Sequence, residues 1–138
     1  MSTCRHMDAT DWDVLLRDLR NIDDIDRAVA ACERLHRDAT AEDQPRLGAL
    51  LGDPSCFVRE AAAWPLSELA GAAALPELFV AYQRGLDEGY DNDGFSAALI
   101  EMASADPHGV RGALNSLIQS SDSRMRENAL WLLEFCAR

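Results

Sequence analysis

Apolar residues along the chain recur with the spacing of amphipathic helices. Leu47, Leu50 and Leu51 lie at i, i+3 and i+4, which places them on one stripe of a helix. The segment 52–55, Gly-Asp-Pro-Ser, then ends this helix, because glycine closes a helix, proline cannot continue one, and Asp or Ser caps the next. A second helix begins near Phe57. No segment alternates apolar and polar residues with period two, so the sequence predicts an all-α fold.

The same helix–turn–helix pattern occurs twice, 67 positions apart. Segments 47–68 and 114–135 align without a gap, and the alignment pairs Leu47 with Leu114, Arg59 with Arg126, Glu60 with Glu127, Trp64 with Trp131, and Leu66 with Leu133. Half of this distance is about 33 to 34 residues, the length of one helical-hairpin repeat. We therefore predict one domain, 1–138, of about four antiparallel hairpins stacked as a short right-handed α-solenoid, with units at approximately 12–38, 43–70, 74–106 and 109–137.

The strings DPSCFVREAAAWPL and SDSRMRENALWLL resemble the HEAT-repeat family of armadillo-like α-solenoids. In that family an Asp or Asp-Pro turn precedes Val-Arg, alanines and leucine. The resemblance implies that Arg59 and Arg126 brace a turn or the neighbouring unit, and that Asp53 bonds or caps in the same network, with Asp122 at the matching place in the last unit. It also implies a binding scaffold that uses a surface lined by its second helices. The fold alone does not fix a function.

Charge narrows the choice of partner. The chain has a formal net charge of −11, and its basic residues are scattered arginines. Without a basic stripe it is not expected to hold a phosphate backbone, which argues against nucleic acid. Strong acidity favours encounter with a basic protein, although acidity that serves solubility alone is the alternative interpretation.

The most unusual segment is GLDEGYDNDGF, residues 85–95, which joins the two helices of the third unit and departs from the repeat register. A calcium loop is one interpretation, but with Gly94 at position 6 the ligand positions 1 and 12 fall on Gly89 and Ile100. A second is a recognition loop for a basic surface, and a third is a solvated turn that caps the next helix. The recognition hypothesis names as partner-binding residues Asp87, Glu88, Tyr90, Asp91, Asn92, Asp93 and Phe95.

Two tryptophans share one repeat position, so their side chains are expected to point in equivalent directions. Each one either fills space between adjacent units or anchors a partner. We place Trp64 among the candidate partner-binding residues and Trp131 among the structural repeat positions.

Few residues are suited to catalysis or metal binding. No histidine falls in a metal-ligand or triad motif, and no two cysteines form a C-x-x-C pair. The histidines and cysteines of the chain are His6, His36, His108, Cys4, Cys32, Cys56 and Cys136. We therefore predict no catalytic residue, no metal and no cofactor. The N-terminal segment does not read as a signal peptide, and no apolar run reaches the length of a membrane span, so a cytoplasmic location is expected.

These observations favour a non-enzymatic protein-binding module with a basic protein partner, acting as a monomer or weak dimer. One specific form of this hypothesis is a bacterial immunity or antitoxin-like protein, because an acidic surface masks a basic nuclease. Two alternatives stay open. One is a general scaffold or regulatory adaptor subunit, and the other is a HEAT-like lyase or chaperone that acts on a cofactor-bearing protein.

Overall fold

The computed structural model describes residues 7–136, so Cys4 and His6 lie outside the described residues. Within this range the fold is all-helical and contains no strand. The α-helices are α1 (Ala9–Leu19), α2 (Ile25–Asp38), α3 (Gln44–Leu50), α4 (Cys56–Ala70), α5 (Leu75–Asp87), α6 (Asp93–Ala105), α7 (Pro107–Leu117) and α8 (Ser123–Leu133). Two short 3₁₀ segments, η1 (Ala41–Asp43) and η2 (Gly71–Ala74), precede α3 and α5.

Acidic and hydroxyl side chains start most of these helices. The carboxylate of Asp8 accepts a hydrogen bond from the Asp11 N–H in a capping box, so α1 begins three residues ahead of the predicted first unit. The side chains of Asp24, Ser55 and Asp122 cap α2, α4 and α8 by accepting hydrogen bonds from backbone N–H groups of the first turn. Several of the chain's many acids therefore serve local structure.

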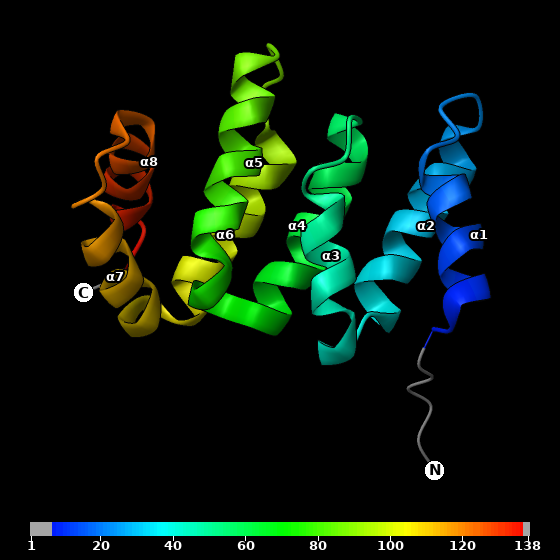
Figure 1. The fold of residues 1–138 in the computed structure, drawn as a ribbon, viewed down its shortest axis with the longest axis horizontal. Helices are drawn as coiled ribbons and strands as arrows, with labels where there is room; N and C mark the ends of the chain where they lie inside the picture. Colours follow the sequence, from blue (N-terminus) through cyan, green and yellow to red (C-terminus); the bar gives the residue numbers. More distant parts are fainter. Residues whose placement is uncertain (1–6, 137–138) are drawn as a thin grey trace.

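The helices form a row that follows the order of the chain, with the two ends of the chain at opposite ends of the row (Figure 1). Within this row α1 packs on α2, α3 on α4, and α7 on α8. The second helices also contact one another in sequence, α2 with α4, α4 with α6, and α6 with α8. The third pair differs, because α5 packs against α4 and α8 more closely than against α6.

Leucines and alanines fill the interior between the helices. The α4 helix is the most enclosed, and it contacts α2, α3, α5 and α6. Its alanines Ala61, Ala62 and Ala63 are buried, and their small side chains let the neighbouring helices approach closely. The leucines of the core with 0 to 2% of their surface exposed are Leu15, Leu19, Leu35, Leu47, Leu66, Leu75, Leu78, Leu99, Leu114 and Leu132.

Candidate interaction surfaces

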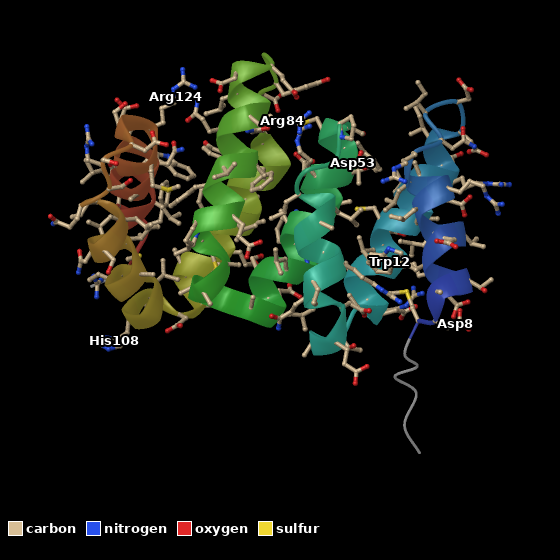
Figure 2. All side chains as sticks on the ribbon, viewed as in Figure 1. Asp8, Trp12, Asp53, Arg84, His108 and Arg124 are labelled. Carbon is tan, nitrogen blue, oxygen red and sulfur yellow. The ribbon has the colours of Figure 1, made fainter. Side chains whose placement is uncertain are left out.

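The turns inside the four helix pairs lie along one edge of the row, which we call the turn edge: residues 20–24, 51–55, 88–92 and 118–122 (Figure 1). Figure 2 shows Asp53, Arg84 and Arg124 along this edge, whereas Asp8 and His108 lie at the opposite edge. Charged side chains connect each helix pair to the next at three junctions along this edge.

At the first junction Arg20 extends from the end of α1 to the second turn. Its Nη2 lies 2.5 Å from Oδ1 of Asp53, a residue that is 33 positions away and buried. The other carboxylate oxygen of Asp53 accepts a hydrogen bond from the Ser55 N–H at 3.0 Å. Burial acts to raise the pKa of Asp53, but the Ser55 N–H and Arg20 outweigh it and the pKa is lowered.

At the second junction Arg59 is the central side chain, with only 1% of its surface exposed. Its Nη1 donates to the carbonyl oxygens of Asp53 at 2.8 Å and Pro54 at 3.1 Å, and its Nη2 donates to Glu88 of the third turn. Arg84 completes the junction, because its Nε donates to Glu88 Oε2 at 3.0 Å and its Nη1 to the Gly52 carbonyl at 3.2 Å. The hydrogen bonds from Arg59 and Arg84 lower the pKa of Glu88.

At the third junction Nη1 of Arg124 lies 2.5 and 2.7 Å from the carboxylate oxygens of Asp87. Gln83 also donates to Asp87, and the hydrogen bonds from Gln83 and Arg124 lower the pKa of that carboxyl group. Arg126, at the repeat position of Arg59, donates to the Ser120 carbonyl at 2.8 Å. Arginine–carboxylate pairs therefore link all four turns.

Asp87 and Glu88 were predicted to bind a partner, and the structure places both in this internal network. Their side chains remain accessible, but their oxygens already accept hydrogen bonds from Arg59, Arg84 and Arg124. Both carboxylates therefore connect neighbouring helix pairs, and their role in partner binding stays a prediction.

The prediction that Asn92 and Phe95 bind a partner is corrected, because both side chains are buried in the interior. Asn92 is 2% exposed and has a left-handed backbone with φ of 59°. Its Nδ2 donates to the Tyr82 carbonyl at 2.6 Å, and a Cβ on Gly85 would lie 2.3 Å from its Oδ1. Phe95 is equally buried, with its ring centroid 5.8 Å from that of Tyr82. These two side chains fix the loop to α5 and face away from solvent.

The outward side of the same loop carries acids that form no ion pair with any described residue. Asp91 and Asp93 are exposed, and Tyr90 between this pair and Glu88 has 53% of its surface exposed. Asp91 Oδ1 accepts a hydrogen bond from the Asp93 N–H at 3.0 Å, so the pair forms its own short turn.

Glu60, on α4, joins these acids. It lies close enough to the backbone of Phe95, in the first turn of α6, for that backbone to favour the charged form of Glu60. Burial raises the pKa of Glu60, and the nearby Asp91 and Asp93 carboxylates raise it further. We call Glu60, Asp91, Asp93 and the exposed Glu101 of α6 the acidic face. Within residues 7–136 no arginine forms an ion pair with any of the four, and α6 itself has no basic residue.

The two repeated tryptophans each contact the preceding helix pair. The Trp131 ring stacks on Tyr82 of α5, with centroids 5.5 Å apart and planes 12° apart. The Trp64 ring lies 6.0 Å from the ring of His36 at the end of α2, and His36 Nε2 lies 2.9 Å from Glu68. Both tryptophans are half-buried. Trp64 therefore combines a contact between helix pairs with a partly exposed surface.

A separate apolar surface lies where the first turn meets α2 and α4. It forms a groove of about 320 Å³, which we call the apolar groove, lined by Leu19, Asn21, Ile22, Ile25, Ala28, Val29 and Phe57. Ile22 is 82% exposed and Ile25 is 70% exposed. Sequence reasoning missed this groove, although Ile22 and Ile25 already interrupt a polar turn whose other residues are Asn21, Asp23 and Asp24.

Comparison with known proteins does not identify a family or a function for the chain. Protein-family models, curated proteins and solved structures were each compared with the chain, and none matches it. Across residues 7–136 there is no group of three or more His, Cys, Asp or Glu side chains placed to hold a metal ion. In the same part of the chain, every helix is too short or too polar to cross a bilayer.

Proposed function

We propose that this chain is a non-enzymatic binding module, a HEAT-like helical solenoid whose acidic face binds a basic protein. One observation carries the proposal. At the junctions of the turn edge Asp53, Asp87 and Glu88 are paired with arginines, whereas within residues 7–136 no arginine pairs with Glu60, Asp91, Asp93 or Glu101. Unpaired negative charge therefore lies on α4, on α6 and on the loop that precedes α6.

Such a face suits recognition of a basic surface for two physical reasons. Unpaired carboxylates attract a positively charged partner over distances of about the Debye length, roughly 8 Å at physiological salt, and so speed its encounter. Tyr90, exposed beside them, offers a rigid amphipathic ring of the kind that anchors many protein interfaces. Glu60 adds a driving force, because a cation placed beside this half-buried carboxylate relieves repulsion from Asp91 and Asp93.

The HEAT-like architecture within this proposal is supported by repeated contacts. Arg59 and Arg126 each donate to a carbonyl of the turn that precedes their own helix, at 2.8 Å in both cases. Trp64 and Trp131 each pack against an aromatic ring of the preceding pair. Residues 67 positions apart therefore make equivalent contacts, as expected for units of one solenoid. An immunity or antitoxin-like role is the form this function takes if the basic partner is a nuclease.

The test is retention of a partner from a lysate of the source organism on immobilised protein, at low and at high salt. The variant Asp91→Lys/Asp93→Lys reverses the charge of two residues of the acidic face. The control Asp13→Lys/Glu77→Lys makes the same change in net charge at exposed acids of α1 and α5. We expect the wild type and the control to retain a basic protein that high salt releases and that the face variant does not retain. Equal retention by all three proteins would refute the acidic face as the binding site.

A further inference from the structure

The apolar groove exposes side chains that folded proteins normally bury. Isoleucine and phenylalanine are among the residues most often found inside proteins, yet Ile22, Ile25, Val29 and Phe57 expose 82, 70, 43 and 38% of their surfaces. They converge from three elements, the first turn, α2 and the start of α4. Grouped apolar exposure of this kind marks an interaction site more often than scattered single residues do.

The charges at the rim identify the partner's chemistry. Two basic residues, Arg20 and Arg27, are adjacent in sequence to lining residues. Arg20 is held by Asp53, and Arg27 lies 3.9 Å from Asp18 and 3.6 Å from Asp24. Asp23 and Asp26, in contrast, are exposed and form no ion pair with the described residues. The rim is therefore negative around an apolar centre. A second copy of this chain would bring acid against acid, whereas a partner with basic residues flanking an apolar stripe matches both features.

We propose that the apolar groove docks one face of an amphipathic helix of the partner, with large apolar side chains between α2 and Phe57 and Lys or Arg beside Asp23 and Asp26. The stripe that would receive it follows α2, because Ile25, Val29 and the half-buried Cys32 lie at i, i+4 and i+7. Helices that lay an apolar face in a groove are a common mode of peptide recognition. The proposal rests on the proposed function in that it assigns a second contact to the same basic partner.

Three synthetic helical peptides of equal length test the groove by fluorescence anisotropy with the full chain. One has a leucine stripe with lysines on its other positions, the second has glutamates in place of the lysines, and the third keeps the lysines but has serines in place of the leucines. We expect only the lysine–leucine peptide to bind tightly. The change Ile25→Ser should weaken it about tenfold or more. Leu130→Ser, at an apolar α8 residue that is 52% exposed, should leave its affinity unchanged.

Other results would contradict the groove as a docking site, and they separate that failure from a failure of the proposed function. If Ile25→Ser, shown to be folded by circular dichroism, binds the lysine–leucine peptide as tightly as wild type, the groove is not the docking site. If the lysine–serine peptide binds equally well and only Asp91→Lys/Asp93→Lys abolishes this, the acidic face stands without the groove. If sedimentation shows a dimer that Ile25→Ser dissociates, the groove binds a second copy and the assignment to a basic partner is wrong.

Discussion

The turn edge and the acidic face use the same residue types in opposite ways. On the turn edge, hydrogen bonds from Ser55 and Arg20 lower the pKa of Asp53, and those from Gln83 and Arg124 lower the pKa of Asp87. Arg59 and Arg84 lower the pKa of Glu88. On the acidic face, burial and neighbouring carboxylates raise the pKa of Glu60. The two regions lie next to each other, since Glu88 and Asp91 belong to one turn.

This contrast shows that a net charge of −11 is not spread evenly over the protein. Several arginines lie at the junctions between helix pairs. Their charge-assisted hydrogen bonds to carboxylates stabilise the packing of one pair on the next. Within residues 7–136 the acids of the acidic face, in contrast, have no arginine partner. Composition alone suggests that acids repel one another evenly over the whole surface. The ion pairs instead distinguish carboxylates that connect helix pairs from carboxylates that can attract a cation.

The largest effect is expected from truncation of the central arginine. Arg59→Ala removes a buried guanidinium that bonds two carbonyls and Glu88, so we expect it to lower the free energy of unfolding by about 3 kcal/mol. Arg126→Ala, at the same repeat position but half-exposed and bonded to one carbonyl, should cost about 1 kcal/mol. Urea unfolding of both variants gives the comparison, and similar losses would contradict a special role for the second junction.

An intermediate effect is expected from Glu88→Gln, and it depends on pH. Because the pKa of Glu88 is lowered in the folded state, its contribution to stability is present above its ordinary value of 4.5 and is lost as the pH falls through the folded value. Wild type should therefore exceed Glu88→Gln in stability at neutral pH, and the difference should shrink below pH 4.5. A difference that stays constant with pH would mean that Arg59 and Arg84 do not stabilise the ionised carboxylate.

The smallest effect, with the opposite sign, is expected at Glu60. Its pKa is raised in the folded state, so its contribution to stability is complete below its ordinary value of 4.5 and is lost as the pH rises through the folded value. Glu60→Gln keeps an oxygen for the Phe95 backbone and removes the charge. This variant should be slightly more stable than wild type at neutral pH and equal to it in acid. A loss of stability at neutral pH would contradict the account of the acidic face.

Sequence periodicity predicts the helices well, because apolar spacing and turn residues are local properties. The second helix of the second unit was expected to begin near Phe57 and begins at Cys56. The 67-residue register also pairs Arg59 with Arg126, and both side chains bond a turn. Helical spacing and turn residues can be read within one unit, and the register follows from comparing two units of the same chain.

Contacts between units were harder to predict, because they depend on how one helix pair is rotated on the next. Glu88 meets Arg59 from 29 positions away, and Asp87 meets Arg124 from 37 positions away, so neither pairing follows from helical spacing. Asn92 read as a polar loop residue, yet it is buried against Tyr82. The available signal was Gly85, a glycine inside a helix, where the missing Cβ leaves room for the Asn92 amide.

The most direct test of the division between the two regions is the free energy of unfolding of two isosteric double variants at neutral pH. Asp87→Asn/Glu88→Gln neutralises the acids paired with arginines, and Asp91→Asn/Asp93→Asn neutralises the neighbouring unpaired acids. We predict that only the first variant is destabilised, while the second matches wild type or exceeds it because like-charge repulsion is relieved. Equal losses in both variants, or a loss in the second alone, would contradict the assignment of these acids to separate structural and binding roles.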